Sequence, residues 1–170
     1  MIEWRGKPVL SGSVPVNDIE PRVSGHDAVP DLIAEIRDAL MRAGINPDAP
    51  RLEDLKPVDH FHTGGAAATE ALLQQLEITP QTRVLDIGCG IGGVARLIAH
   101  RAGAPVTGLD ISGDYTQTAQ TLCEAIGTTD RTNFVVGDAL AMPFEADSFD
   151  LAVMFHVGMT IEDKKRLFSE

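Results

Sequence analysis

The sequence predicts an α/β fold built on a doubly wound parallel sheet that is incomplete at its C-terminal side. Short, nearly continuous apolar runs alternate with amphipathic helical segments, a pattern typical of parallel strands buried on both faces. A glycine-rich stretch, residues 88–93, joins one such run directly to a helical pattern. The 170 residues are the length of one ordinary domain, and 44% hydrophobic with 23% charged residues is a globular composition.

Charge and cysteine content narrow the classes of partner. The formal net charge of −11 argues against binding to a nucleic-acid phosphate backbone, which needs clustered Lys and Arg. We interpret the acidity as keeping a cytoplasmic protein soluble, and the weaker alternative is an acidic field that favours a cationic ligand. Cys89 and Cys123 stand in no metal-ligand spacing, so we predict no metal site and a reducing compartment, the cytoplasm. The chain start lacks a signal-peptide pattern, and no run reaches the roughly 20 apolar residues that span a membrane. We therefore expect neither nucleic-acid nor membrane partners.

Residues 1–29 are predicted to form an irregular N-terminal arm. The prolines at positions 8, 15 and 21, with Gly and Ser between them, exclude a continuous helix. Two alternatives stay open for this arm, a partly disordered leader and an ordered lid over an active site.

Residues 30–78 are predicted to form a helical cap segment. From Pro30 to Gly44 an apolar stripe alternates with charged residues, as in an amphipathic helix, and proline and glycine suit its two ends. A proline-rich turn follows this helix. Residues 51–56 are then expected to form one short helical turn before Pro57.

The segment Asp59–Gly65 has the composition of a functional loop. It places two imidazoles, an aromatic ring and a hydroxyl group before two glycines, in the side chains of His60, Phe61, His62 and Thr63. The alternative is structural, with the aromatic ring in the core and the histidines capping backbone groups. A further helix is expected over residues 66–77, with a buried face of Ala67, Leu72, Leu73 and Leu76.

Residues 79–170 are predicted to form a cofactor-binding domain. Its strands are expected at residues 84–87, 106–111, 133–138 and 149–156, and its helices at residues 94–100, 115–126 and from about residue 161. In an open α/β sheet ligands bind at the carboxyl ends of the strands. The polar residues expected there are Asp86, Asp110, Asp138 and His156.

Two of these acids refine the interpretation of the glycine loop, whose spacing alone is a weak signal. Asp110 lies about twenty residues beyond the loop, where a carboxylate accepts hydrogen bonds from ribose hydroxyls of either NAD or another nucleoside. Asp86 directly precedes the loop, where its charge would repel a pyrophosphate and would suit a cationic amino group. The alternative for Asp86 is an acid that bonds loop N–H groups for structural reasons.

Residues 84–93 resemble the first motif of class I S-adenosylmethionine-dependent methyltransferases. Residues 108–112 resemble the acidic second strand of that family, and residues 137–150 its third motif and the approach to its fourth strand. The resemblance extends over about residues 58–170. It is strongest to small-molecule methyltransferases of the quinone-biosynthesis and sterol or tocopherol type, some of which have a segment similar to residues 59–65 before the first motif.

The resemblance implies a Rossmann-like fold, S-adenosyl-L-methionine as the cofactor, and a role for each site residue. Asp86 and the loop residues Gly88, Cys89, Gly90 and Gly92 would line the methionine portion. Asp110 would hold the ribose, Ile111 would pack on the adenine, and Asp138 with Ala139 would contact the adenine amino edge. Phe61 and Thr63 would close over the methionine end. His156 is the candidate catalytic base, and its alternative is a structural histidine.

We therefore expect transfer of a methyl group to a small-molecule acceptor. Two alternatives stay open, an NAD-dependent oxidoreductase and a non-catalytic cofactor-binding fragment. Relative to the family pattern, strands five to seven are missing, which leaves the fourth strand as an edge. We expect either a fragment of a longer protein or a sheet completed by another chain, such as a second copy, and this puts independent activity in doubt.

Overall fold

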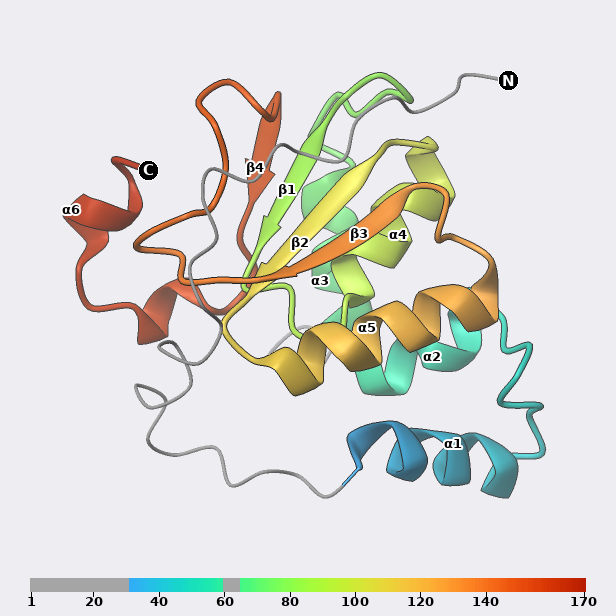
Figure 1. The fold of residues 1–170 in the computed structure, drawn as a ribbon. Helices are drawn as coiled ribbons and strands as arrows, with labels where there is room; N and C mark the ends of the chain where they lie inside the picture. Colours follow the sequence, from blue (N-terminus) through green and yellow to red (C-terminus); the bar gives the residue numbers. More distant parts are fainter. Residues whose placement is uncertain (1–30, 60–64) are drawn as a thin grey trace.

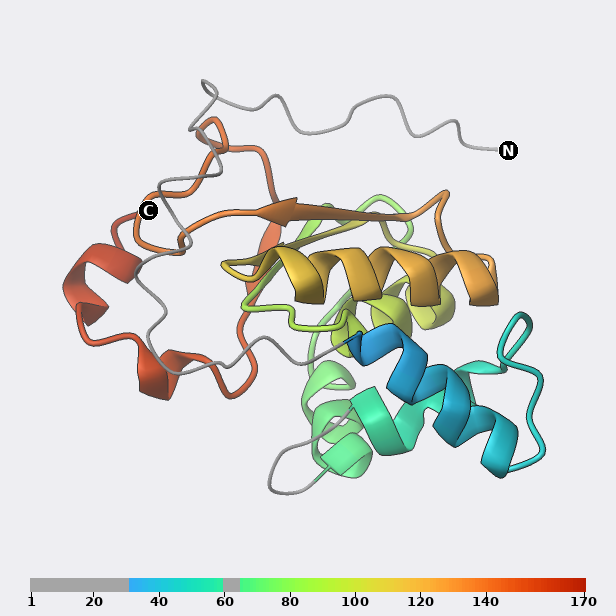
Figure 2. The same ribbon diagram turned by 60° about the horizontal axis from the view of Figure 1, so that its bottom comes forward.

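A four-stranded parallel sheet organises the computed structural model, which describes residues 31–59 and 65–170. Figures 1 and 2 show helices packed against one face of the sheet, with the helices of the N-terminal part of the chain outside them. The strands are β1 (Val84–Ile87), β2 (Val106–Asp110), β3 (Thr132–Val136) and β4 (Leu151–Val153). The helices are α1 (Leu32–Arg42), α2 (Leu52–Asp59), α3 (Gly65–Leu73), α4 (Gly93–Ala102), α5 (Gly113–Ile126) and α6 (Lys164–Leu167), with a 3₁₀ turn, η3, at Gly158–Thr160.

The strand order is β3-β2-β1-β4, and every pairing is parallel. Val84 of β1 lies in register with Val106 of β2 on one side and with Leu151 of β4 on the other. The chain moves outward from β1 to β3 and then crosses back to β4, so the order reverses next to β1. Ligands bind at the carboxyl ends of strands at such a switch point. The expected α/β parallel fold is confirmed.

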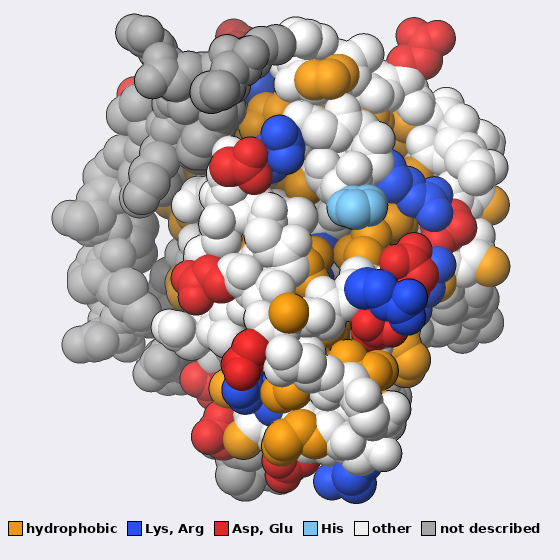
Figure 3. Space-filling model, turned by 90° about the vertical axis from the view of Figure 1, so that its right-hand side faces the viewer, with side chains coloured by type: hydrophobic (Ala, Val, Ile, Leu, Met, Phe, Trp, Pro, Cys, Tyr) orange, Lys and Arg blue, Asp and Glu red, His pale blue; other side chains and the backbone are white. Residues whose placement is uncertain are grey.

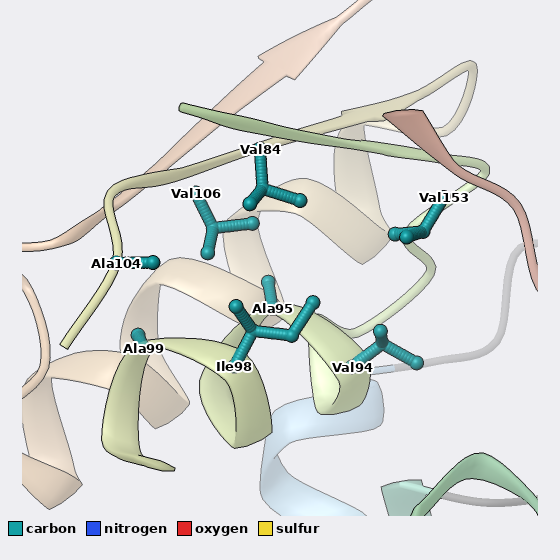
Figure 4. Close-up of a cluster of buried hydrophobic side chains, with 8 residues drawn as sticks. All are labelled: Val84, Val94, Ala95, Ile98, Ala99, Ala104, Val106 and Val153. Atoms are coloured by element: carbon teal, nitrogen blue, oxygen red, sulfur yellow. The ribbon is translucent and has the colours of Figure 1, made fainter. Parts of the chain in front are cut away.

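One face of the sheet forms the main core against α4. Figure 4 shows the valines of three strands pointing toward the small and branched side chains of this helix. Strand alternation sends the next residues to the opposite face, where Leu85, Ile87 and Leu109 pack against side chains of the segment between β3 and β4. The rings of two of these residues, Phe144 and Phe149, pack edge to face, with their centroids 5.0 Å apart. Helices thus cover one face, and this irregular segment covers the part of the other face around Leu85, Ile87 and Leu109.

A second cluster joins the N-terminal helices to the sheet domain. Ile36 and Leu40 of α1, Leu55 of α2 and Leu122 of α5 are buried together. Ile91, from the glycine loop, packs against the same cluster. Residues 31–59 therefore contact both a helix of the sheet domain and the loop that follows β1.

The first predicted helix is confirmed as α1. The side chain of Asp31 caps its start by accepting the N–H of Ala34 at 3.3 Å. Beyond its end, Gly44 has a φ of +75°, a left-handed conformation that glycine adopts without strain.

The prediction that the helical turn after residue 51 stops before Pro57 is wrong. Helix α2 continues through Pro57 to Asp59. A proline near a helix end removes one intrahelical hydrogen bond, and here Leu52 and Leu55, which are 8% and 0% exposed, hold the helix against the core. Burial outweighs the lost bond.

The face predicted to be buried on the third helix is also wrong. Ala67 is exposed, Leu72 and Leu76 are 51% and 38% exposed, and only Leu73 of the predicted set packs against the core. The fully buried residue is Thr69, which lies one turn before Leu73. Because α3 ends at Leu73, Leu76 lies outside the helical repeat, and the neighbouring helices decide which face turns inward.

The fourth strand and the last helix are shorter than predicted. β4 covers three residues, because the chain leaves the extended conformation after Val153 and reaches a φ of +60° at His156. The helix expected from about residue 161 is replaced by η3 and the four-residue α6.

Charged side chains of both signs lie near one another on the surface. Figure 3 shows Lys and Arg side chains next to Asp and Glu side chains on the face at the right of Figure 1. Glu70 of α3, for example, contacts Lys56 at 3.2 Å and Arg101 at 2.9 Å. Within residues 31–59 and 65–170, no helix has the length and apolarity needed to cross a membrane.

Candidate functional site

The loop between β1 and α4 is built by three glycines with positive φ. Gly88, Gly90 and Gly92 have φ values of +69°, +53° and +79°, a region that residues with a Cβ atom avoid. The N–H groups of Gly88 and Cys89 donate to the carbonyl of Leu109 at 2.8 and 3.0 Å. These bonds fix the loop on the end of β2, and α4 begins directly after it.

The space around the three glycines differs. A Cβ atom on Gly88 would lie 2.4 Å from Val157, and one on Gly92 would lie 2.8 Å from Phe134. A Cβ atom on Gly90 would have no atom of the described residues within 4 Å. Two of the glycines therefore allow close packing, and the third faces a space that the described residues leave open.

Asp110, at the carboxyl end of β2, is tied to the open part of the loop. Its two oxygens accept the N–H groups of Gly90 at 2.8 Å and of Ser112 at 3.0 Å. Its carbonyl accepts the N–H of Gly137, which follows β3, at 2.9 Å. The carboxylate is therefore fixed at the point where three segments of the site meet.

Asp86 is buried under the start of α4. Its side chain is 1% exposed and accepts the backbone N–H of Ala95, while Oδ2 has no hydrogen-bond partner among the described residues. Burial, and to a lesser extent the charge of Asp110, raise the pKa of Asp86 to about 7. The structure thus shows an acid that bonds backbone and is destabilised in its charged form.

The side chain of Cys89 is buried between the loop and β2, and its Sγ lies 3.7 Å from the carbonyl oxygen of Gly90. It is 8% exposed and lies against Gly108, where an added Cβ would be 2.7 Å from its sulfur. Burial, helped by the negative charges of Asp86 and Asp110, raises the pKa of the Cys89 thiol well above its usual range. These effects favour the protonated thiol, which is the less nucleophilic form.

The residues predicted to contact adenine lie at the ends of β2 and β3. Ile111 directly follows Asp110 and is half-buried. Asp138 accepts the N–H of Leu140 at 2.8 Å, and Ala139 packs on the face of the sheet opposite α4. The hydrogen bond between Asp110 and Gly137 brings these segments together.

His156 is the third residue after the end of β4, and its side chain is exposed. The next residue, Val157, packs against Gly88, so this segment borders the glycine loop. Phe61 and Thr63, with His60 and His62, lie outside the described residues, and their predicted roles stay predictions.

Sequence reasoning missed a buried ion pair next to the loop. The guanidinium of Arg96, on α4, bonds the carboxylate of Asp59 at the end of α2, and their side chains are 0% and 2% exposed. A signal was present in the sequence, because residues 94–99 are apolar apart from this arginine. A charged residue on a helix that is otherwise apolar all round needs a buried partner.

Comparison with known proteins supports the resemblance described above. Residues 84–170, just over half of the chain, match the family described as methyltransferase domain. The chain is 37% identical over 99 residues to a sterol 24-C-methyltransferase of Gibberella zeae, covering 58% of this chain and 26% of that protein. It is 38% identical over 87 residues to a probable tocopherol O-methyltransferase of Oryza sativa, covering 51% and 24%. The chain thus spans about a quarter of the length of these relatives.

A solved structure has a fold similar to that of this chain. It is a Haemonchus contortus N-methyltransferase in complex with phosphomonomethylethanolamine and S-adenosylhomocysteine, with a TM-score of 0.63 and 26% identity. The similarity covers 92% of this chain and 32% of that one. The parallel sheet, the glycine loop and the family match agree, and the chain belongs to the methyltransferase domain family.

Proposed function

We propose that this chain binds S-adenosylmethionine at the glycine loop and takes part in methyl transfer to a small-molecule acceptor. The observation that carries the proposal is the carboxylate of Asp110, which holds the N–H of Gly90 beside an open space at the carboxyl edge of the sheet. A carboxylate in this position suits a ribose. The family membership, and the S-adenosylhomocysteine in the similar structure, support this nucleoside over a dinucleotide.

The hydrogen-bonding capacity of Asp110 fits two ribose hydroxyls. The two carboxylate oxygens accept the backbone N–H groups of Gly90 and Ser112, and an ionised carboxylate accepts hydrogen bonds from hydroxyl groups as well as from N–H groups. Both oxygens are held in place before any ligand arrives. This preorganisation lowers the ordering cost of binding.

Asp86 adds negative charge behind the loop. Its pKa of about 7 means that the described residues stabilise its charged form too little to offset its burial. A cationic ligand nearby would stabilise that form and lower this pKa. The NAD-dependent alternative would instead set a pyrophosphate near this acid, which Coulomb repulsion disfavours.

The cofactor would supply a methyl group activated by a positively charged sulfur. The protein then needs mainly to hold donor and acceptor in line. The close contacts of Gly88 with Val157 and of Gly92 with Phe134 fix the loop that would carry out this alignment.

A pair of glycine variants tests the site. Gly90→Ala introduces a methyl group where the described residues leave space, so we expect affinity for S-adenosylhomocysteine to fall at least tenfold. Gly127→Ala is the matched control, because Gly127 has a similar φ of +72° and equally open surroundings at the end of α5. Both substitutions cost about 1–2 kcal/mol of backbone strain. Isothermal titration calorimetry compares the two, and equal affinities would contradict the assignment.

Asp110→Ala tests the ribose contact separately. We expect weaker S-adenosylhomocysteine binding by at least tenfold, since two charge-assisted hydrogen bonds would be lost. No heat and no thermal shift with either S-adenosylmethionine or S-adenosylhomocysteine in the unmodified chain would refute the proposed function as a whole.

The acceptor is proposed only as a small molecule. The two relatives are named for methylation at carbon and at oxygen, so the segment that they share with this chain fits more than one acceptor chemistry. His156 is the proposed base for acceptors that must lose a proton, because its segment borders the glycine loop through Val157. The cytoplasm is the proposed location, because a reducing compartment suits the two free, buried cysteines Cys89 and Cys123.

A further inference from the structure

The tip of the glycine loop is held from the N-terminal side of the chain. The side chain of Ile91 packs against the cluster formed by α1, α2 and α5. Its carbonyl accepts a hydrogen bond of 2.6 Å from Nη1 of Arg96. Ile91 lies between Gly90, which faces open space, and Gly92, which packs on Phe134. The conformation of the open part of the loop therefore depends on these two anchors.

Arg96 is in turn oriented by Asp59. The other terminal nitrogen of its guanidinium, Nη2, bonds the Asp59 carboxylate, and both side chains are almost fully buried. Nε of Arg96 has no hydrogen-bond partner among the described residues, so Ile91 and Asp59 set the plane of the guanidinium together with a long contact to Cys123. Because the guanidinium group is planar and rigid, a shift of the Asp59 carboxylate would change the direction in which Nη1 points toward the Ile91 carbonyl.

The end of α2 also lies directly against the start of α4. A Cβ atom on Gly93 would be 2.6 Å from Cβ of Asp59 and 3.0 Å from its backbone oxygen. The backbone N–H of Arg96 donates to the carbonyl of Gly92 at 2.9 Å, so the same residue holds both sides of the loop's last turn. A displacement of Asp59 would therefore shift the first turn of α4.

A role in stability alone does not account for this arrangement. A buried ion pair often contributes no more to stability than apolar side chains of similar volume, because both charges are desolvated. The ion pair with Asp59 also fixes the direction of Nη1 of Arg96, the donor that binds the carbonyl of Ile91.

We propose that Arg96, held by Asp59, is a positioning residue for the glycine loop, which makes residues 31–59 a working part of the cofactor site. The inference rests on the proposed function, because the loop is taken as the site that binds S-adenosylmethionine. It adds that the affinity of this loop depends on a residue that ends α2, more than thirty positions earlier in the chain.

Two variants test the inference, and a third serves as a matched control. Arg96→Lys keeps the charge opposite Asp59, but an ammonium group lacks the planar fork that reaches both acceptors. Asp59→Asn keeps an acceptor of the same shape and removes its charge. The control is Asp150→Asn, which breaks an Arg–Asp pair of the same chemistry, Arg83–Asp150 at 2.7 Å, at the opposite end of β1.

Two readouts separate positioning from general stability. Backbone amide resonances of Gly90 and Gly92 report the loop conformation without any ligand, with those of Gly103 and Gly127 as internal references. Calorimetric titration with S-adenosylhomocysteine, well below the melting temperature of each variant, reports affinity. We expect Arg96→Lys and Asp59→Asn to shift the two loop resonances and to weaken binding about tenfold, and Asp150→Asn to change neither.

The outcomes also distinguish this inference from the proposed function. Unchanged Gly90 and Gly92 resonances in folded Arg96→Lys, with affinity within twofold of the unmodified chain, would overturn the inference and leave the cofactor assignment standing. If the unmodified chain binds no S-adenosylhomocysteine, the proposed function fails, and with it the effect on affinity. If Asp59→Asn does not fold, Arg96→Lys alone decides.

Discussion

The two ends of β1 shift the pKa of a nearby aspartate in opposite directions. At its amino end, the exposed carboxylate of Asp150 accepts three hydrogen bonds from Arg83, one from the backbone and two from the guanidinium. These bonds lower the pKa of Asp150 to about 2. At the carboxyl end, burial raises the pKa of Asp86 to about 7, and one of its oxygens has no partner among the described residues.

The difference separates a carboxylate that stabilises the fold from one that costs stability. Asp150 gains from being charged, whereas Asp86 keeps its charge only at a cost that the N–H of Ala95 offsets in part. Strongly perturbed acids at the edge of a sheet are typical of sites that receive a ligand. The Arg83–Asp150 pair at the amino end thus stabilises the fold, and the carboxyl end is the end at which we propose that the ligand binds.

The buried pair of Arg96 and Asp59 provides the largest expected effect. Asp59→Ala would leave a fully buried guanidinium without its counter-ion, so we expect the free energy of unfolding to fall by about 3–5 kcal/mol. Urea denaturation at neutral pH measures the change. Asp150→Ala, which breaks the exposed pair, is the control and should shift the midpoint far less. Equal shifts of the urea midpoint in the two variants would show that the buried pair and the exposed pair contribute equally to stability, contrary to this prediction.

Asp86→Asn gives the next effect and depends on pH. The folded pKa of about 7 lies above the unfolded value near 3.8, so between these values the folded state binds the proton that the unfolded state has lost. Stability should therefore fall as the pH rises from about 4 to about 7, by on the order of 2 kcal/mol between pH 5 and pH 8.

The asparagine variant should lack this slope, because its amide does not titrate. It should thus gain stability relative to the unmodified chain at pH 8 and lose affinity for a cationic cofactor. Urea denaturation at the two pH values measures the slope. An identical slope in both proteins would assign the pH dependence to other groups and weaken the case for Asp86.

Asp150→Asn gives the smallest effect, with the opposite pH dependence. The folded pKa of Asp150 is lowered, so its contribution is present above the unfolded value near 4 and disappears as the pH falls through about 2. The variant should be slightly less stable than the unmodified chain at pH 7 and equal to it near pH 2. Because the pair is exposed, 1 M salt should reduce the difference at pH 7. A difference that persists in salt would indicate a role for Asp150 beyond this pair.

Much of the fold and part of the site were predictable because they depend on local signals. The apolar run at Val84–Ile87, the glycines after it and the helical spacing of α4 all lie within twenty residues of one another. The same holds for the prediction that Asp110 ends a strand near the loop, where it bonds Gly90. The periods of strands and helices, together with the chemistry of glycine, suffice for such elements.

Other features depend on partners that are distant in the sequence. The continuation of α2 through Pro57, and the exposure of Leu72 on α3, follow from which neighbours each helix meets. Periodicity identifies an apolar stripe, but it does not say which of two similar faces will be covered.

By itself, the sequence determined the α/β class, the order of strand, glycine loop and helix, and the set of acids at the strand ends. Only the tertiary structure decided that Asp86 is buried under α4 with a raised pKa, and that Arg96 meets Asp59 across 37 positions. The physical reason is that burial and electrostatic pairing depend on distances in space. Sequence periodicity fixes only the distances between near neighbours along the chain.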